Sequence, residues 1–145
     1  MDDGVDYGDK LFWLSVLIQR RYAQICAELD LTPMQATLLC AIKDEPGRMT
    51  RLATSLGMTK NALSQLVDRT ERRELVSRVS SEQDRRVIML GVTPAGKVLA
   101  EAVFAETAKR LPEIAAGLDA DDRQTLERVV TALVDASGVE GPAST

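Results

Sequence analysis

The chain has 145 residues and a formal net charge of −4, which suits one domain with an ordinary hydrophobic core. No apolar run approaches the roughly 18 residues of a membrane span, and residues 1–9 lack the basic and apolar parts of a signal peptide, so we expect a cytoplasmic protein with no membrane contact. The chain contains no histidine, the commonest metal ligand and general base, and we expect neither a metal site nor a cofactor.

Two helices are predicted at the start of the chain. Over residues 10–30 apolar side chains recur every three or four positions, and this stripe is wider than one core contact requires. The second helix begins at Thr32, which can cap it, while Gln35 can reach back as in a capping box. It ends before the Pro-Gly pair at residues 46–47.

A helix-turn-helix is predicted next. A short helix at 50–56 and a longer one at 59–73 meet at Gly57, which can adopt the positive φ of a tight turn. Thr59 can cap the second helix, whose N-terminal turns carry outward polar side chains suited to base edges in a major groove. These side chains are Lys60, Asn61, Ser64 and Gln65. The alternative is an ordinary helical hairpin with a polar exposed face.

A β-hairpin follows. The β-branched and apolar segments 76–79 and 87–92 predict two strands, and the polar segment 80–86 predicts their connection. A basic hairpin tip directly after such a helix is typical of a wing, from which an arginine can enter the minor groove. The sequence therefore predicts a winged helix-turn-helix over residues 32–92.

The C-terminal part is predicted to be helical. Thr93 caps a helix that runs to about residue 117, with Pro112 expected to kink or end it, and Asp119 opens the last helix. The helices at 10–30 and 97–137 carry more apolar surface than one small domain can cover, so we expect them to form the dimerisation region of a homodimer. Residues 138–145 are predicted to be a flexible tail. The expected fold class is mainly α with a small β-hairpin wing.

Charge is distributed unevenly along the chain. Residues 47–90 contain nine Lys or Arg and five Asp or Glu, whereas the remainder contains nine basic and seventeen acidic residues. A basic middle in an acidic protein indicates a local surface for a polyanion such as DNA.

Three segments resemble the signature of the MarR family of transcriptional regulators. They are Asp68–Arg78 (DRTERRELVSR), Ser81–Arg86 (SEQDRR) and Val92–Gly96 (VTPAG), and the Leu31–Gln35 segment is similar to the start of the family's second helix. Two residues depart from the family pattern, because Glu74 stands where a glycine is usual and Thr70 where a leucine is usual.

The resemblance implies a role for each matching residue. Arg86 takes the place of the minor-groove arginine, and Asp84 that of the carboxylate which orients it. Asn61, Ser64 and Gln65 fall where the family reads bases. Four cations, Lys60, Arg69, Arg78 and Arg85, are expected mainly to bind phosphates. The resemblance implies a repressor, dimeric on a near-palindromic duplex operator and released by a small molecule.

The first predicted helix suggests where that small molecule binds. Trp13, Leu17 and Arg20 follow one another at spacings of four and three, so an aromatic ring could stack there while Arg20 or its neighbour Arg21 pairs with a carboxylate. The alternative is a tryptophan in the dimer core beside a solvated arginine.

Two other functions remain open. Cys26 or Cys40 could make the regulator redox-responsive, although both lie in apolar helical patterns typical of buried side chains, and residues 11–16, where peroxide-sensing relatives have their cysteine, contain none. A winged-helix module that docks on protein is the second alternative. The sequence shows no phosphate-binding glycine loop, nucleophile elbow or cluster of metal ligands, so we expect that the protein is not an enzyme.

Overall fold

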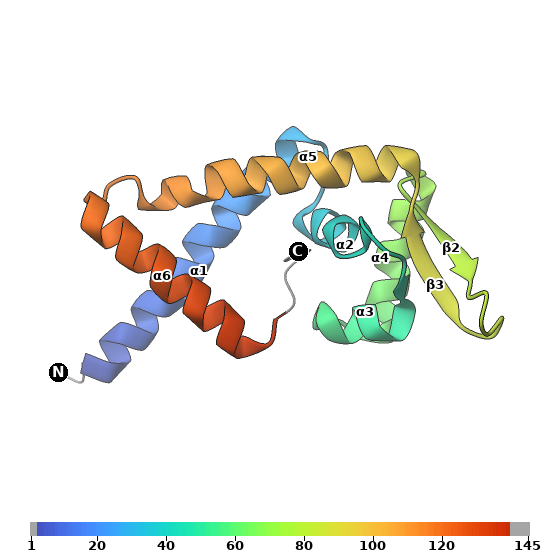
Figure 1. Cartoon of the computed structure of the whole chain (residues 1–145), viewed down its shortest axis with the longest axis horizontal. Helices are drawn as coiled ribbons and strands as arrows, with labels where there is room; N and C mark the ends of the chain where they lie inside the picture. The colour runs from blue at the N-terminus through green and yellow to red at the C-terminus, as the bar shows by residue number, and fades with distance from the viewer. Residues whose placement is uncertain (1–2, 140–145) are drawn as a thin grey trace.

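The computed structural model describes residues 3–139 and shows a mainly helical chain with one small antiparallel sheet (Figure 1). The elements follow in the order α1 (Asp3–Glu28), α2 (Pro33–Ile42), β1 (Gly47–Arg48), α3 (Met49–Ser55), α4 (Lys60–Arg72), β2 (Val76–Ser80), β3 (Ile88–Val92), α5 (Pro94–Arg110), a 3-10 helix η1 (Leu111–Ala115) and α6 (Ala120–Ser137). The expected fold class, mainly α with a β-hairpin wing, is confirmed.

The molecule has two parts joined by α5. In Figure 1, α2, α3, α4 and the sheet gather at one end of α5, while the N-terminal half of α1 and the whole of α6 lie at the other. Most of the hydrophobic core lies in the first part, which we call the winged lobe (residues 32–92), and Cys26, Leu31, Ala100 and Val103 outside it complete the core. Its fully buried side chains include Leu38, Leu39, Leu63, Leu66 and Leu90.

The helix-turn-helix forms as the sequence predicts. Gly57 adopts φ +65°, and the turn closes with hydrogen bonds from Met58 N to Ala53 O (2.8 Å) and from Gly57 N to Thr54 O (3.1 Å). This pair of bonds is a Schellman motif, in which a residue with left-handed backbone ends the helix. The Thr59 hydroxyl then accepts a hydrogen bond from Ala62 N and caps α4. The turn therefore directs the exposed N-terminus of α4 away from the core.

The sheet has one strand more than expected. β2 and β3 pair from Val76↔Val92 to Ser80↔Ile88, and β1 adds to the other edge of β3, with Arg48 opposite Met89. The Pro-Gly pair at residues 46–47 predicts only the end of a helix. In the structure the backbone after Pro46 is extended and places Arg48 beside the wing.

The base of the wing is held against α5. Glu74 ends α4 with φ +59°, the left-handed backbone for which a glycine is usual. The Thr93 hydroxyl donates to Glu74 O (2.7 Å) and accepts from Gly96 N, while Thr93 N donates to Leu75 O. A Cβ on Gly96 would lie 1.9 Å from Leu75 O, so this close approach requires glycine. The Val-Thr-Pro-Ala-Gly segment thus joins the wing to α5.

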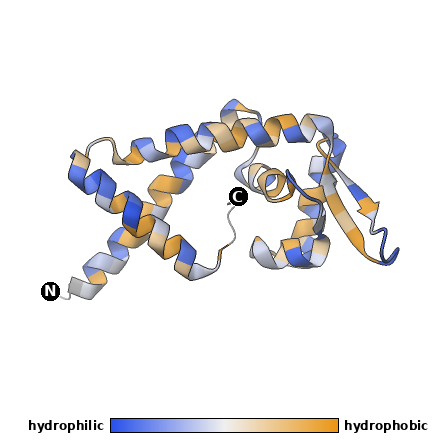
Figure 2. Cartoon of the chain, in the orientation of Figure 1, coloured by the Kyte–Doolittle hydropathy of each residue, from blue (hydrophilic) through white to orange (hydrophobic). Residues whose placement is uncertain are grey.

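The helices outside the winged lobe expose apolar side chains. α6 has no buried residue, and Val129, Val130, Leu133 and Val134 on it are all exposed. The N-terminal half of α1 likewise exposes apolar side chains, namely Val5, Tyr7, Leu11, Phe12, Trp13 and Leu17, and Figure 2 shows apolar patches along both helices.

Several boundaries differ from the sequence prediction. α1 begins at Asp3 rather than near residue 10, and α5 ends at Arg110, where Leu111 and Pro112 open the 3-10 helix. Gly138 ends α6 with φ +71°, and most of the expected tail, residues 140–145, lies outside the described residues. Within residues 3–139 no single helix is long and apolar enough to cross a membrane. The helices Gly4–Glu28 and Pro33–Ile42 are together long and apolar enough, but the chain bends by 81° between them.

Candidate nucleic-acid interface

The outward face of α4 carries the polar side chains predicted to read DNA. Lys60, Asn61 and Gln65 are exposed and Ser64 is half-buried, while Leu63 and Leu66 between them are buried in the core. The arrangement follows from helical periodicity, because residues three and four apart share a face. No acidic residue lies in the first turn, so the positive end of the helix dipole is left uncompensated there. This end of α4 can therefore receive an anionic or hydrogen-bonding partner.

The tip of the wing presents an arginine held by a carboxylate. The Arg86 backbone N and side-chain Nε donate to Asp84 Oδ1 at 3.0 and 3.2 Å, and Arg86 Nη2 donates to Oδ2 at 3.4 Å. These bonds hold the pKa of Asp84 below its usual range, so the carboxylate stays ionised at neutral pH. The Arg86 side chain is nevertheless 91% exposed. Asp84 thus orients Arg86 and leaves it open to a partner.

Arg48 also lies beside this tip, although the sequence alone does not predict its position there. Arg48 is exposed on β1 and lies close enough to Asp84 to lower the pKa of that carboxyl further. A two-residue strand gives no periodic signal, so only the excess of positive charge over residues 47–90 could have indicated it. With Arg85 and Arg86, both exposed, Arg48 forms a cationic surface at the wing.

The remaining predicted cations differ in their surroundings. Arg69 is exposed on the last turn of α4, in keeping with a phosphate contact. Arg78, predicted in the same role, instead places its guanidinium between two carboxylates of α4, Asp68 and Glu71. Sequence reasoning misses these two acidic partners because they lie ten and seven positions away along the chain.

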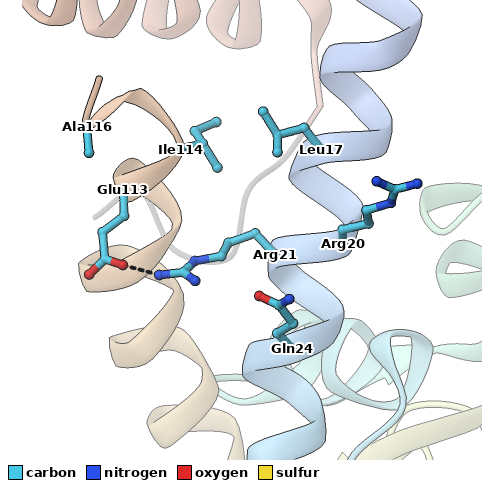
Figure 3. A pocket seen from close by; sticks show the side chains of 7 residues that line it. All are labelled: Leu17, Arg20, Arg21, Gln24, Glu113, Ile114 and Ala116. Atoms are coloured by element: carbon cyan, nitrogen blue, oxygen red, sulfur yellow. Dashed lines mark hydrogen bonds and ion pairs between the residues drawn. The ribbon is translucent and has the colours of Figure 1, made fainter. Parts of the chain in front are cut away.

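The predicted ligand-binding residues are only partly brought together. An open hollow of about 580 Å³ lies between α1 and η1 and is lined by Leu17, Arg20, Arg21, Gln24, Glu113, Ile114 and Ala116. Trp13 does not line it and packs edge-on against Phe12, with 55% of the residue exposed. Figure 3 shows the Arg21 side chain extending across the hollow to Glu113, whereas the Arg20 guanidinium points away from the other lining side chains.

Arg21 has a buried donor group that is left unpaired among the described residues. Its Nη2 binds the Glu113 carboxylate, but its Nε is buried and makes no hydrogen bond with any described residue. A buried donor without an acceptor costs free energy, so an acceptor that entered the hollow would relieve it. The hollow therefore combines an apolar wall at Leu17 and Ile114 with a cationic group.

The cysteines lie where α1, α2 and α5 meet. Cys26 is fully buried, and the thiol of half-buried Cys40 lies 3.7 Å from Ala100 O. Burial raises the pKa of Cys26 and raises that of Cys40 to about 11. Because the thiolate is the reactive form, both thiols are poor nucleophiles at neutral pH.

Comparison with known proteins agrees with this geometry. The model of the MarR family matches residues 29–87, which span the helix-turn-helix and most of the wing. The uncharacterised HTH-type transcriptional regulator YhbI of Bacillus subtilis is 27% identical over 117 residues, covering 79% of this chain and 76% of its own.

Solved structures share the fold. The C80S mutant of MarR from E. coli complexed with operator DNA superposes with a TM-score of 0.75 at 21% identity, covering 92% of this chain and 96% of its own. The transcriptional repressor CouR bound to a 23-mer DNA duplex gives a TM-score of 0.73 at 26% identity, with 88% and 91% covered.

Proposed function

We propose that this chain, whose residues 29–87 match the model of the MarR family, is a DNA-binding transcriptional regulator of that family and a homodimeric repressor of the genes beside an operator that it reads. The observation that carries the proposal is the wing tip, where Asp84 holds an arginine that is almost fully exposed. Such an arginine suits the narrow and electronegative minor groove.

The proposed DNA contacts come from two elements of the winged lobe. Asn61, Ser64 and Gln65 on α4 meet base edges in the major groove, supported by the Thr59 cap. Arg86 enters the adjacent minor groove. The flanking cations, Lys60, Arg69, Arg85 and Arg48, bind phosphates, which adds affinity without sequence preference.

A second copy of the chain completes the proposed reader. The exposed apolar side chains of α1 and α6 have no cover among residues 3–139, and apolar side chains left exposed in this number are typical of an obligate interface. We expect α1 and α6 of one copy to pack against the same helices of a second copy across a two-fold axis. The two α4 helices would then enter successive major grooves of a near-palindromic duplex about 34 Å apart. A repressor of this kind works in the cytoplasm.

Footprinting and gel-shift assays on the region upstream of its own gene test the proposal. We expect protection of a near-palindromic segment, with affinity that falls steeply as salt is raised. Arg86→Ala should weaken binding about tenfold or more and leave the fold unchanged, because among the described residues the Arg86 side chain bonds only to Asp84 at the wing tip. Lys109→Ala removes an exposed cation near the far end of α5 and serves as the matched control. Equal affinity of the wild type and Arg86→Ala would refute the wing assignment.

The hollow between α1 and η1 supports the second part of the proposal, a small anionic aromatic effector. Its ring would pack against Leu17 and Ile114, and its carboxylate would replace Glu113 at Arg21 and accept from the unpaired Nε. Trp13, expected at this site, does not line the hollow, and the guanidinium of Arg20 points away from the other lining side chains. We therefore assign the pairing role, which the sequence leaves open between the two arginines, to Arg21.

Calorimetry with benzoic and phenylacetic acids tests the effector site. Arg21→Ala should abolish binding, while Arg20→Ala should retain it because the Arg20 guanidinium points away from the other side chains that line the hollow. Glu113→Gln removes the competing carboxylate and should tighten binding. Equal affinities for all four proteins would remove the hollow from consideration. Burial of Cys26 and Cys40 favours this ligand-responsive function over a redox-responsive one.

A further inference from the structure

The guanidinium of Arg78 connects the wing to the recognition helix. Its Nη1 donates to Glu71 Oε1 at 2.7 Å and its Nη2 donates to Asp68 Oδ1 at 2.8 Å. Both bonds are short and charge-assisted, and each uses a different arm of the planar guanidinium. Two-thirds of the Arg78 side chain is shielded from solvent. One side chain therefore bridges two points on α4 from one point on β2.

Arg78, Asp68 and Glu71 lie where their ion pairs can fix the orientation of the wing relative to α4. Asp68 and Glu71 are three positions apart on α4, and Asp68 follows Ser64 by four, so it continues the outward face of that helix. Arg78 stands in the middle of β2 opposite Leu90, which is fully buried. Between α4 and β2 the chain makes only a short turn with a left-handed residue. The ion pairs consequently restrict the angle between α4 and the β2–β3 hairpin.

We propose that Arg78 is a positioning residue of the DNA interface, which fixes the wing relative to α4 by binding Asp68 and Glu71 and does not itself bind phosphate. The inference rests on the proposed function, because it concerns how α4 and the wing reach the two grooves together. Minor-groove entry by Arg86 and base reading by Asn61 require a set distance between these elements. A loosely held wing would satisfy only one of these interactions at a time.

The alternative role is the one that the family resemblance implies for Arg78, which is to bind a phosphate. A phosphate contact would require the guanidinium to leave its partners, and two ionised carboxylates would then stay unpaired beside the polyanion. The two roles thus predict opposite effects when Asp68 and Glu71 are neutralised. In the positioning role neutralisation weakens DNA binding, and in the phosphate role it strengthens it.

A mutant cycle on DNA affinity distinguishes the two roles. The proteins are the wild type, Arg78→Ala, Arg78→Lys, Asp68→Asn with Glu71→Gln, and Arg78→Ala combined with both neutral substitutions. Fluorescence anisotropy would be measured on the footprinted duplex and on a random-sequence duplex of equal length. We expect each variant to bind the footprinted duplex about tenfold more weakly than the wild type, with the combined variant no weaker than either parent. Arg78→Lys keeps the charge but cannot span both carboxylates.

Coupling to the wing tip separates positioning from a general loss of stability. Arg78 binds carboxylates of α4 and Arg86 binds Asp84, so the two arginines have no ion-pair partner in common among residues 3–139. The cost of Arg86→Ala should nevertheless shrink in the Arg78→Ala background, because a displaced wing no longer delivers Arg86 to its groove. Urea unfolding should show all variants folded, since these ion pairs are partly exposed and contribute little to stability.

Three results would overturn the inference while the proposed function stands. They are full affinity in Arg78→Ala or Arg78→Lys, tighter binding by the neutralised double variant, or an undiminished cost of Arg86→Ala. A wild type that binds the footprinted and random duplexes equally would instead refute the proposed function, and the positioning role with it.

Discussion

Glu74 offers a way to stabilise this protein by removing a side chain. It is the C′ residue of a Schellman motif, with hydrogen bonds from Glu74 N to Glu71 O (2.8 Å) and from Leu75 N to Thr70 O (3.3 Å), and its φ is +59°. The Glu74 side chain is exposed, and among the described residues it makes no hydrogen bond or ion pair. Glu74→Gly should therefore relieve backbone strain while every bond of the turn is kept.

The magnitude follows from three opposing contributions. A non-glycine residue in the left-handed region costs about 1 to 2 kcal/mol, and a negative charge at a helix C-terminus costs about 0.3 kcal/mol or more. Glycine loses about 0.4 to 1 kcal/mol more in conformational freedom on folding. The net expectation for Glu74→Gly is a gain of about 1 kcal/mol in the free energy of unfolding, or about 3 °C in Tm for a chain of this size.

Glu74→Ala is the matched control, because it removes the same charge but keeps a Cβ at positive φ. Urea unfolding of the wild type and both variants, followed by circular dichroism, measures the three stabilities. We expect the alanine variant to recover only the small charge contribution and the glycine variant to exceed it by about 0.7 kcal/mol. A glycine variant no more stable than the alanine variant would show that the left-handed backbone at Glu74 carries no strain.

Three further predictions concern the wing and the cysteines. Gly96→Ala should destabilise the fold by about 1 to 3 kcal/mol in urea unfolding, because the added Cβ meets the carbonyl oxygen of Leu75, and wild-type stability would contradict that close approach. Arg48→Ala should weaken operator binding in anisotropy titrations and lower the magnitude of the salt slope by about 0.9 for each phosphate that Arg48 neutralises, whereas an unchanged slope would remove Arg48 from the interface. Cys26 and Cys40 should react with a thiol reagent at pH 8 only after denaturation, since burial raises both pKa values and the thiolate fraction grows only as the pH approaches those values. Rapid labelling of the native protein would contradict this.

Local signals in the sequence are sufficient for the helix caps and for the tight turn of the helix-turn-helix. The sequence predicts that Thr32, Thr59 and Thr93 each cap a helix, and each hydroxyl accepts the expected backbone hydrogen bond. It also predicts positive φ at Gly57, which the structure confirms. These features depend on residues within four positions of one another, so a pattern in the sequence contains them completely.

Features that depend on distant residues are not predictable in the same way. β1 is too short for a periodic pattern and exists because β3 offers an edge, so the sequence does not reveal that Arg48 lies beside the wing tip. The partners of Arg78 and Arg21 are set by packing between elements, and no spacing rule links Arg21 to Glu113 across 92 positions. The early start of α1 does have a local signal, because acidic residues favour a helix N-terminus, but the apolar stripe that predicts this helix begins only near residue 10.

The unbroken course of α5 has a mechanical consequence. Near one end, Gly96 packs against the Leu75 carbonyl oxygen at the base of the wing, and at the other end Arg110 binds Glu28 of α1. Seventeen residues at about 1.5 Å each make a rod of about 25 Å, so a tilt of only about 5° displaces one end by about 2 Å relative to the other. A tilt of this size at the end of α5 that adjoins η1 would therefore shift the winged lobe by a distance over which a hydrogen bond is broken.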